Sequence, residues 1–535
     1  MSDKGKLRVR RSLEDLQAAY DKGDKKPLEN LWRAWKGIKE LPADDPNSFF
    51  MIGGYHGEPF RGAGWGNSAW WGGYCNHGNV LFPTWHRVYM LRLEDALRSV
   101  HGCGDVTMAY WDECSDASTS GGLPKALTDE FVTLDGQSIP NPIRSFVFTK
   151  QITDNINGDD PNYSKPLGYE TVRYPLSGLV GTPADQAATK AHNAKYPDYA
   201  ANVGILNGNI VNWLTSSITV DGQVIPTNEK AAYQACLDAP NYTAFSNTTS
   251  AAQWNEDNPN GVVTPVESPH NAIHLACGGY DVATGANAGD DSPVEGANGD
   301  MGENDTAGLD PLFYFHHCFI DRMFWLWQQK NGHTDHLDII EGYPGTNSVD
   351  NQGPTPGVAG GTWLGMDSLL APFKKADGKT YTSRDCVNIE KQLGVTYGPG
   401  SLEPGARLDA LSVKPPPAKI LAVSAINRGA IRGSFLINAY VNHDGKRLRI
   451  GTEAVLSRWT VAGCANCQTH LEVKAHFALP QALAEGAPPN YEIELRTHDG
   501  PMSHTHVAAL GTVSGTKQLF RLQVRDVYAP AQAAE

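Results

Sequence analysis

The segment DPLFYFHHCFIDRMFWLW, residues 310–327, places the strongest constraint on how this chain can fold. Asp310 followed by Pro311 is typical of a helix start, because aspartate caps free backbone N–H groups and proline suits the first turn. The helix that follows is strongly apolar, so a histidine on its inner face must be buried and needs a polar partner. His316 and His317 point about 100° apart on a helix and therefore cannot share one role.

Five further histidines have positions that suit metal binding. His270 and His274 lie four residues apart in HNAIHLACGG, which is typical of a short helix ended by glycines, so their side chains meet on one face. His86 lies at the start of a second apolar helix, while His56 and His77 lie in loops that could fold over it. With one histidine of the 310–327 helix, these residues form two groups of three.

The composition of each group indicates which metal it would hold. Three neutral imidazoles without a thiolate or carboxylate suit copper best and zinc less well, and they leave a coordination position open. A di-iron site would need paired Glu-x-x-His motifs, and only Glu267 with His270 has that spacing near these groups. Buried histidines satisfied by carbonyl groups, and a dinuclear zinc hydrolase, remain the alternatives.

The residue pattern changes from helical to strand-like near residue 400, which predicts two domains. Residues 1–400 read as mainly helical, with amphipathic patterns in 12–40 and a strong helix over 84–100 that Thr84 would cap. Residues 401–418 contain the stiff proline triplet of a linker. Residues 419–535 hold short runs of alternating or β-branched residues separated by turns, which predicts a smaller antiparallel β-sandwich.

The overall charge and composition exclude several classes of partner. A formal net charge of -15 argues against nucleic acid and anionic membranes, which attract basic surfaces. We expect no membrane partner, because no apolar run is long enough to cross a bilayer. The first residues carry charge without a hydrophobic stretch, so we expect a cytoplasmic protein, unless a partner exports it. The 9 cysteines are scattered and do not form the pattern of a disulfide framework.

Three ordered motifs resemble one known family. CNHGNVLFPTWHRVYMLRLE, SPHNAIH and GDMGENDTAGLDPLFYFHHCFIDRMFWLW are similar to the tyrosinase family of type 3 copper proteins, which includes catechol oxidases and molluscan haemocyanins. The likeness covers roughly residues 45–400. It implies a four-helix bundle that holds a dinuclear copper centre of two copper ions, followed here by a β-rich lid domain as in fungal members.

The resemblance also implies a ligand set. In the family's His-His pair the second histidine is the ligand, which leaves His316 in a supporting place. Asp321, one turn further on, would orient an imidazole or pair with Arg322. Cys75 has the Cys-x-His spacing at which some members form a thioether with the histidine. The six copper ligands, three for each ion, would be His56, His77 and His86, and His270, His274 and His317.

The activity implied is that of a polyphenol oxidase with O2 as co-substrate. Small phenols would be hydroxylated at the ortho carbon and catechols oxidised to quinones. In tyrosinases a glutamate and an asparagine hold a water that takes the phenolic proton, and Glu267 and Asn271 match those positions. Structurally, Glu267 could merely cap its helix and Asn271 could be exposed. The alternatives are a catechol oxidase or o-aminophenol oxidase, or a haemocyanin-like O2-binding protein.

The C-terminal domain would keep the enzyme latent by covering the copper site. The side chain that enters the pocket would be Val455, Leu456 or Trp459. Cys464 and Cys467 have the Cys-x-x-Cys spacing that suits copper delivery, or they form a disulfide or an inert pair. Three histidines of this domain could assist them: His470, His504 and His506.

One feature of the core departs from the family pattern. The core often ends in a Tyr-x-Tyr motif, but here Val395 replaces the first tyrosine and only Tyr397 remains. The sequence leaves open whether the chain forms a homo-oligomer.

Overall fold

The structure is a computed structural model of the whole chain. It describes residues 7–57, 73–153, 163–282, 296–347, 361–403, 417–459, 472–484, 490–504 and 520–527. Cys464, Cys467, His470 and His506 lie outside the described residues, as does most of the predicted linker. His504 is described only as a backbone position in a strand.

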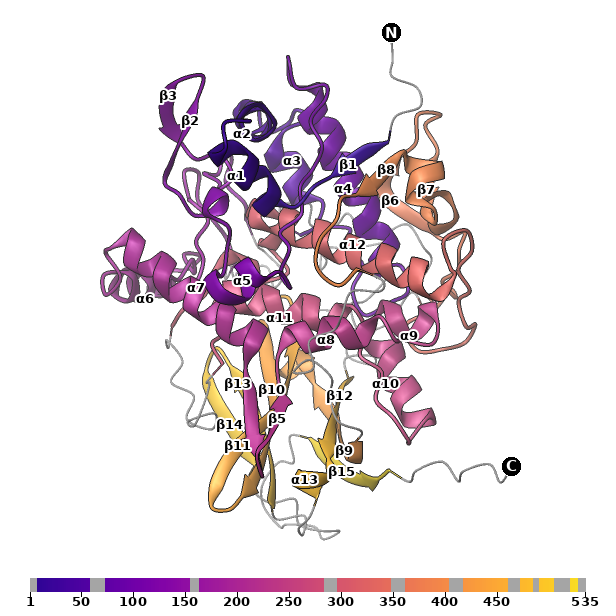
Figure 1. Cartoon of the computed structure of the whole chain (residues 1–535). Coiled ribbons are helices and arrows are strands. Elements are labelled where there is room, and N and C mark those ends of the chain that lie inside the picture. Colours follow the sequence, from indigo (N-terminus) through magenta and orange to yellow (C-terminus); the bar gives the residue numbers. More distant parts are fainter. Residues whose placement is uncertain are drawn as a thin grey trace.

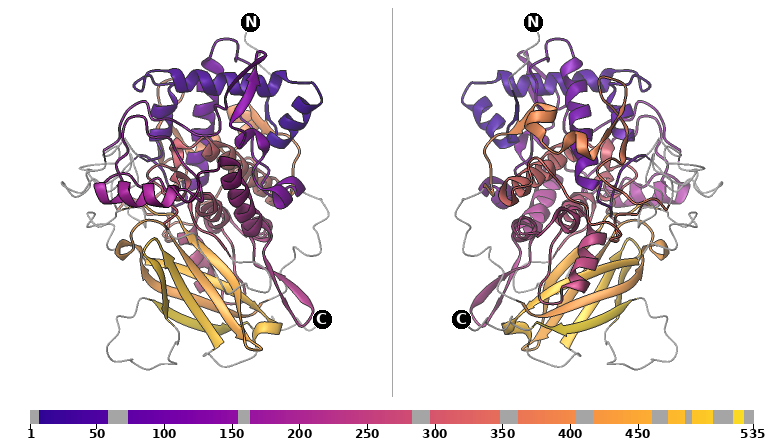
Figure 2. Two further views of the ribbon diagram at one scale, coloured as in Figure 1. Left: turned by 90° about the vertical axis from the view of Figure 1, so that its left-hand side faces the viewer. Right: turned by 90° about the vertical axis from the view of Figure 1, so that its right-hand side faces the viewer.

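The first part of the chain is rich in helices, as expected, and the strands of the C-terminal part gather at one end of the molecule (Figures 1 and 2). The α-helices are α1 Leu13–Asp21, α2 Lys26–Glu40, α3 Phe49–Gly54, α4 Phe82–Ser99, α5 Asp116–Gly121, α6 Pro183–Asn193, α7 Tyr199–Thr215, α8 Glu229–Cys236, α9 Tyr242–Ser246, α10 Thr248–Asp257, α11 Glu267–Gly278, α12 Leu312–Asn331 and α13 Gln481–Ala484. In the described residues, no helix is both long and apolar enough to span a membrane.

Two of these helices test the predicted helix starts. In α12 the N-cap position is Pro311, and the Asp310 carboxylate just before it accepts from the backbone N–H of Leu312 at 2.9 Å, so Asp310 satisfies one free N–H group at the helix start. In α4 the expectation for Thr84 was wrong. The helix starts earlier, at Phe82, because Pro83 fits its first turn, and the Thr84 hydroxyl lies 2.7 Å from Ser383 Oγ instead.

The strands of the C-terminal part form two antiparallel sheets. One has the order β11-β10-β13-β14 and the other β12-β9-β15. Apolar side chains of both sheets, such as Leu421 in β9 and Ile437 in β10, belong to one hydrophobic cluster. The strands of the C-terminal part are β9 Pro417–Asn427, β10 Phe435–His443, β11 Lys446–Val455, β12 Glu472–Pro480, β13 Tyr491–Thr497, β14 Gly500–His504 and β15 Arg521–Asp526.

Short strands of the helical part pair two by two. They are β1 Arg8–Arg10, β2 Phe131–Leu134, β3 Gln137–Pro140, β4 Ser217–Val220, β5 Gln223–Pro226, β6 Leu369–Lys374, β7 Thr380–Thr382 and β8 Val395–Tyr397.

The C-terminal part packs directly on helix α11. Ala272, Leu275 and Ala276 of α11 share a buried apolar cluster with Leu436 of β10 and Leu456. Burial of this apolar surface stabilises the docked arrangement, since each buried methylene contributes about 0.8 kcal/mol. The two parts of the chain therefore meet on the helix that carries His270 and His274.

The end of the helical part is held by a buried charge network. β8 pairs in parallel with β1, and the Tyr397 hydroxyl donates to Asp321 Oδ2 at 2.6 Å. Asp321 Oδ1 accepts from Arg87 Nε at 2.6 Å. Both expectations for Asp321 were therefore wrong. Its partners are Arg87, Tyr397 and Arg10, the last at 3.4 Å. Arg322 pairs with Glu403 instead. These partners lie far away in the sequence, so the local spacing could not reveal them.

Candidate metal centre

The first histidine group is assembled from three separate places in the chain. His56 follows α3, His77 lies in the loop before α4, and His86 lies in the second turn of α4. All three side chains are buried, and one nitrogen of each lies within 4.8 Å of the others. The structure thus brings together the three residues that the sequence placed in this group.

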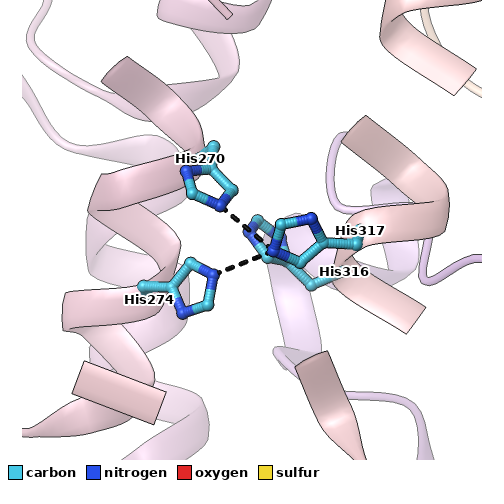
Figure 3. Close-up of side chains that lie close together, drawn as sticks. All are labelled: His270, His274, His316 and His317. Carbon is cyan, nitrogen blue, oxygen red and sulfur yellow. Dashed lines mark hydrogen bonds between the residues drawn. The ribbon is translucent and has the colours of Figure 1, made fainter. Parts of the chain in front are cut away.

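The second group is formed between α11 and α12. Nε2 of His317 lies 3.1 Å from Nε2 of His270 and 3.2 Å from Nε2 of His274 (Figure 3). The i, i+4 spacing on α11 brings His270 and His274 to the same face, as predicted. His316 also has a nitrogen within 4.8 Å of the others, which the sequence did not anticipate.

Hydrogen bonds at Nδ1 orient most of these imidazole rings. Nδ1 of His86 lies 2.9 Å from the Phe82 carbonyl, and Nδ1 of His274 lies 2.8 Å from the Met301 carbonyl. Nδ1 of His56 lies 3.2 Å from the Asn304 carbonyl. Because Nδ1 donates to a fixed oxygen, Nε2 of the same ring is left with the free lone pair that a metal ion requires.

His316 is engaged on its other side by a buried carboxyl group. Its Nδ1 lies 2.6 Å from Oε1 of Glu113, and the Tyr233 hydroxyl donates to Oε2 of the same carboxyl at 2.6 Å. The His316 ring stacks on His270 with 5.2 Å between centroids. Burial raises the pKa of Glu113 and lowers that of His316, so the pair avoids two separated buried charges.

The electrostatics of both groups favour neutral imidazoles. Burial and the neighbouring histidines lower the pKa of the ligand candidates, in the case of His86 to about 3. In the described structure, Nε2 of His56, Nε2 of His86 and both nitrogens of His77 are buried without a hydrogen-bond partner. Buried unpaired nitrogens are costly, and a bound cation would satisfy them. This donor set fits copper.

The two groups lie side by side. The rings of His86 and His317 stack with 4.5 Å between their centroids, and those of His77 and His270 lie 5.6 Å apart. Two ions bound here would therefore be neighbours and could act on one small molecule between them.

Glu267 and Asn271 lie near the second group, and both side chains are buried. Asn271 is buried, and its Oδ1 lies 2.9 Å from Nδ1 of His270. Glu267 does not cap its own helix: its carboxylate accepts from the backbone N–H groups of Gly78 at 2.8 Å and Thr248 at 2.9 Å. Burial raises the Glu267 pKa, although these donors oppose the shift.

A cavity of about 340 Å³ lies at the seam between the helical part and the C-terminal sheets. Glu267 and Asn271 line it from one side, and Val455 and Leu456 line it from the other. Trp459 lies elsewhere, with its ring 5.6 Å from that of Tyr163. Among the three residues expected to cover the site, Val455 and Leu456 are therefore the ones placed beside Asn271.

Cys75 lies two residues before His77 and is buried. Its sulfur is 3.6 Å from the amide nitrogen of Asn304 and 3.6 Å from Nη2 of Arg458 in the C-terminal part. Burial raises the pKa of its thiol. The thioether to His77 stays a prediction.

Comparison with known proteins agrees with this geometry. The common central domain of tyrosinase matches residues 46–330, a range that contains all six proposed ligands. A tyrosinase of Hahella sp. is 52% identical over 91% of this chain and 90% of its own length. This chain belongs to the tyrosinase family. The resemblance found in the sequence motifs is thus confirmed, and the family is one of dinuclear copper oxidoreductases.

Two further members of the tyrosinase family match nearly the whole chain. A tyrosinase of Aspergillus oryzae is 42% identical over 91% of this chain and 92% of its own length. A solved structure of a tyrosinase from Burkholderia thailandensis at low pH is 51% identical, with a TM-score of 0.79, and the match covers 91% of this chain and 94% of that chain. The likeness therefore includes the C-terminal sheets as well as the helical part.

Proposed function

We propose that this protein is a tyrosinase that hydroxylates monophenols at the ortho position and oxidises o-diphenols to o-quinones with O2. The observation that carries the proposal is the pair of adjacent, buried histidine groups in a chain of the tyrosinase family. In the first group, Nε2 of His56, Nε2 of His86 and both nitrogens of His77 have no hydrogen-bond partner. One copper ion would be held by His56, His77 and His86, and the other by His270, His274 and His317. Bound copper supplies the activation of O2 for attack on the phenol ring.

The chain's own residues would prepare the phenol. Hydroxylation requires the phenol to lose its proton, and a water held by Glu267 and Asn271 is well placed to accept it. Both side chains line the same cavity, and Asn271 contacts the ring of His270, which supports this role. Asn271 also accepts from His270 Nδ1 and so keeps that ring oriented.

The finer architecture is also part of the proposal. We infer that α2, α4, α11 and α12 form the four-helix bundle around the copper ions, in a catalytic domain over residues 1–400. The strands after the linker form a β-sandwich lid over 419–535. Copper delivery by Cys464 and Cys467, self-association and a cytoplasmic location stay predictions.

The lid would keep the enzyme latent, because Val455 and Leu456 lie where a phenol would approach Asn271. Cleavage within residues 401–418, followed by removal of the C-terminal fragment, should raise phenol oxidation. A copper-loaded sample carried through the same steps with inactivated protease is the control. Unchanged activity after clean removal of the fragment would contradict latency.

Oxygen uptake after copper reconstitution tests the proposed activity. The enzyme should consume O2 with a monophenol and with the matching catechol. Uptake with the catechol alone would favour a catechol oxidase, and uptake with an o-aminophenol alone would favour an aminophenol oxidase. Reversible O2 binding without turnover would identify a haemocyanin-like carrier.

A further inference from the structure

One short loop, residues 300–306, supports a histidine of each group. The Met301 carbonyl lies 2.8 Å from Nδ1 of His274, and the Asn304 carbonyl lies 3.2 Å from Nδ1 of His56. A carbonyl that holds Nδ1 fixes both the tautomer and the direction of the ring. The position of this loop therefore bears on both metal groups at once.

Close backbone packing joins the same loop to the segments that carry these histidines. A Cβ placed on Gly278, at the end of α11, would lie 2.1 Å from the Cα of Gly302. A Cβ placed on Gly57, directly after His56, would lie 2.3 Å from the carbonyl oxygen of Asp305. Only glycine permits such contacts, so the backbone of the loop packs directly against both histidine segments.

Residues of the C-terminal part form hydrogen bonds with the other side of the loop. The backbone N–H of Asn304 donates to the Ser457 carbonyl at 3.0 Å, whereas the backbone carbonyl of Asn304 contacts His56. One residue thus links the C-terminal domain to a histidine of the first group. The backbone N–H of Trp459 donates to Asp305 Oδ2 at 2.8 Å. His498 Nε2 lies 2.6 Å from Glu303 Oε1.

These contacts are buried and make the lid a partner of the loop. Glu303 is 0% exposed and Asp305 2% exposed in the docked structure. Arg458 of the C-terminal part places Nη1 3.5 Å from Asp305 Oδ1 and Nη2 3.6 Å from the sulfur of Cys75. If the lid were released, the carboxylates of Glu303 and Asp305 would become exposed to solvent. The loop would then lose its hydrogen bonds to the C-terminal domain.

We propose that Glu303 and Asp305 are positioning residues through which the docked C-terminal domain fixes the histidines of both copper groups. The inference rests on the proposed function, since it requires that these histidines hold copper. It assigns the lid a second role besides covering the site. Its docking holds the loop 300–306, and the loop holds His56 and His274 in the direction that copper requires.

The rate at which bound copper is lost to excess EDTA tests this proposal without any substrate. Asp305→Ala and Glu303→Ala remove the contacts from the core side, and Arg458→Met removes one from the lid side. Lys474→Met is the matched control, because Lys474 joins the lid to Glu256 of α10 at 3.0 Å, a contact that does not involve the loop. The thermal midpoint of each metal-free variant separates general loss of stability from a local effect.

The two loop variants and Arg458→Met should release copper at least about tenfold faster than the wild type, as expected when a group that orients a ligand is removed. X-ray absorption at the copper edge should show fewer imidazole nitrogens per ion. Lys474→Met should match the wild type in both measurements. If a core-side variant fails to fold, Arg458→Met decides the matter.

Release at the wild-type rate from folded loop variants would overturn this inference and leave the proposed function standing. A wild-type protein that takes up no copper under reconstitution would overturn both. Equally fast release from Lys474→Met would also contradict the inference, because the effect would then come from loosened docking in general and not from this loop.

Discussion

Nδ1 of His316 lies 2.6 Å from the carboxyl group of Glu113, whereas Nε2 of the neighbouring His317 lies 3.1 Å from Nε2 of His270. The two adjacent histidines thus face different partners. His317 completes the second group, and His316 is held by Glu113 and supports the His270 ring by stacking. Separate roles for the pair follow from this arrangement.

Substitution of each histidine should separate these roles. His317→Ala should leave about one copper per chain, because the second group loses the ligand at which His270 and His274 converge. His316→Ala should keep both ions but bind the second about 10–100-fold more weakly, since only a supporting contact is lost. Elemental analysis after equilibration with a buffered copper series measures both effects. Equal losses from the two variants would contradict the separation.

Asn271 and Glu267 should control the monophenolase reaction more than the diphenolase reaction. Asn271→Ala and Glu267→Gln should lower monophenol turnover by about 100-fold or more relative to catechol turnover, because general-base assistance contributes 10²–10⁴-fold. Steady-state oxygen uptake with a monophenol and its catechol gives the ratio. Thr249→Ala, at another residue lining the cavity, is the control. An unchanged ratio in both base variants would refute the assignment.

Docking of the lid should weaken as the pH rises. Burial and the nearby Glu267 raise the pKa of Glu453 to about 7 in the docked structure, while its carboxyl accepts from Ser268 Oγ at 2.8 Å. A released lid would restore an ordinary glutamate pKa near 4.3. The docked state therefore binds the proton more tightly. The contribution of protonated Glu453 is complete below about pH 4 and is lost as the pH rises through 7.

After cleavage in residues 401–418, size-exclusion chromatography at about pH 5.5 and about pH 8 measures this dependence. The C-terminal fragment should stay with the core more fully at the lower pH, and Glu453→Gln should reduce the difference. Asp444→Asn changes an exposed turn of the same domain and serves as the control. A wild-type fragment that dissociates more readily at the lower pH would reverse the predicted sign.

The Asp321 network should dominate the stability of the helical part. Asp321→Ala leaves the buried guanidinium groups of Arg87 and Arg10 without this carboxylate, which typically costs about 3–5 kcal/mol in the free energy of unfolding. Asp367→Asn breaks an exposed pair with Arg384 and should cost less than about 1 kcal/mol. Urea unfolding of the metal-free proteins compares the two. Similar losses of unfolding free energy in the two variants would show that the buried network stabilises the protein no more than an exposed ion pair does.

The sequence was most informative where the structural signal is local. The spacing of His270 and His274 predicted a shared helix face, and the apolar helix over 310–327 predicted burial of its histidines. The motifs and their order then pointed to the family. Thr84 failed as a cap because Pro83 starts the helix earlier, a competition between two local signals.

Contacts between distant segments could not be predicted in the same way. Glu113 meets His316 across 203 positions, and Asp305 meets Trp459 across 154. No periodic pattern marks either carboxylate, because each owes its place to the packing of separate elements. The role of Asp321 was missed for the same reason, since its partners lie on α4, β1 and β8.

Anomalous diffraction at the copper edge, from crystals of the reconstituted protein, tests the central claim most directly. The account predicts two peaks, one bonded to His56, His77 and His86 and the other to His270, His274 and His317, at Cu–N distances of about 2.0–2.1 Å as for other imidazole-bound ions of this size. His316 should remain on Glu113. A single peak, or a second ion bonded to His316 in place of His317, would contradict it.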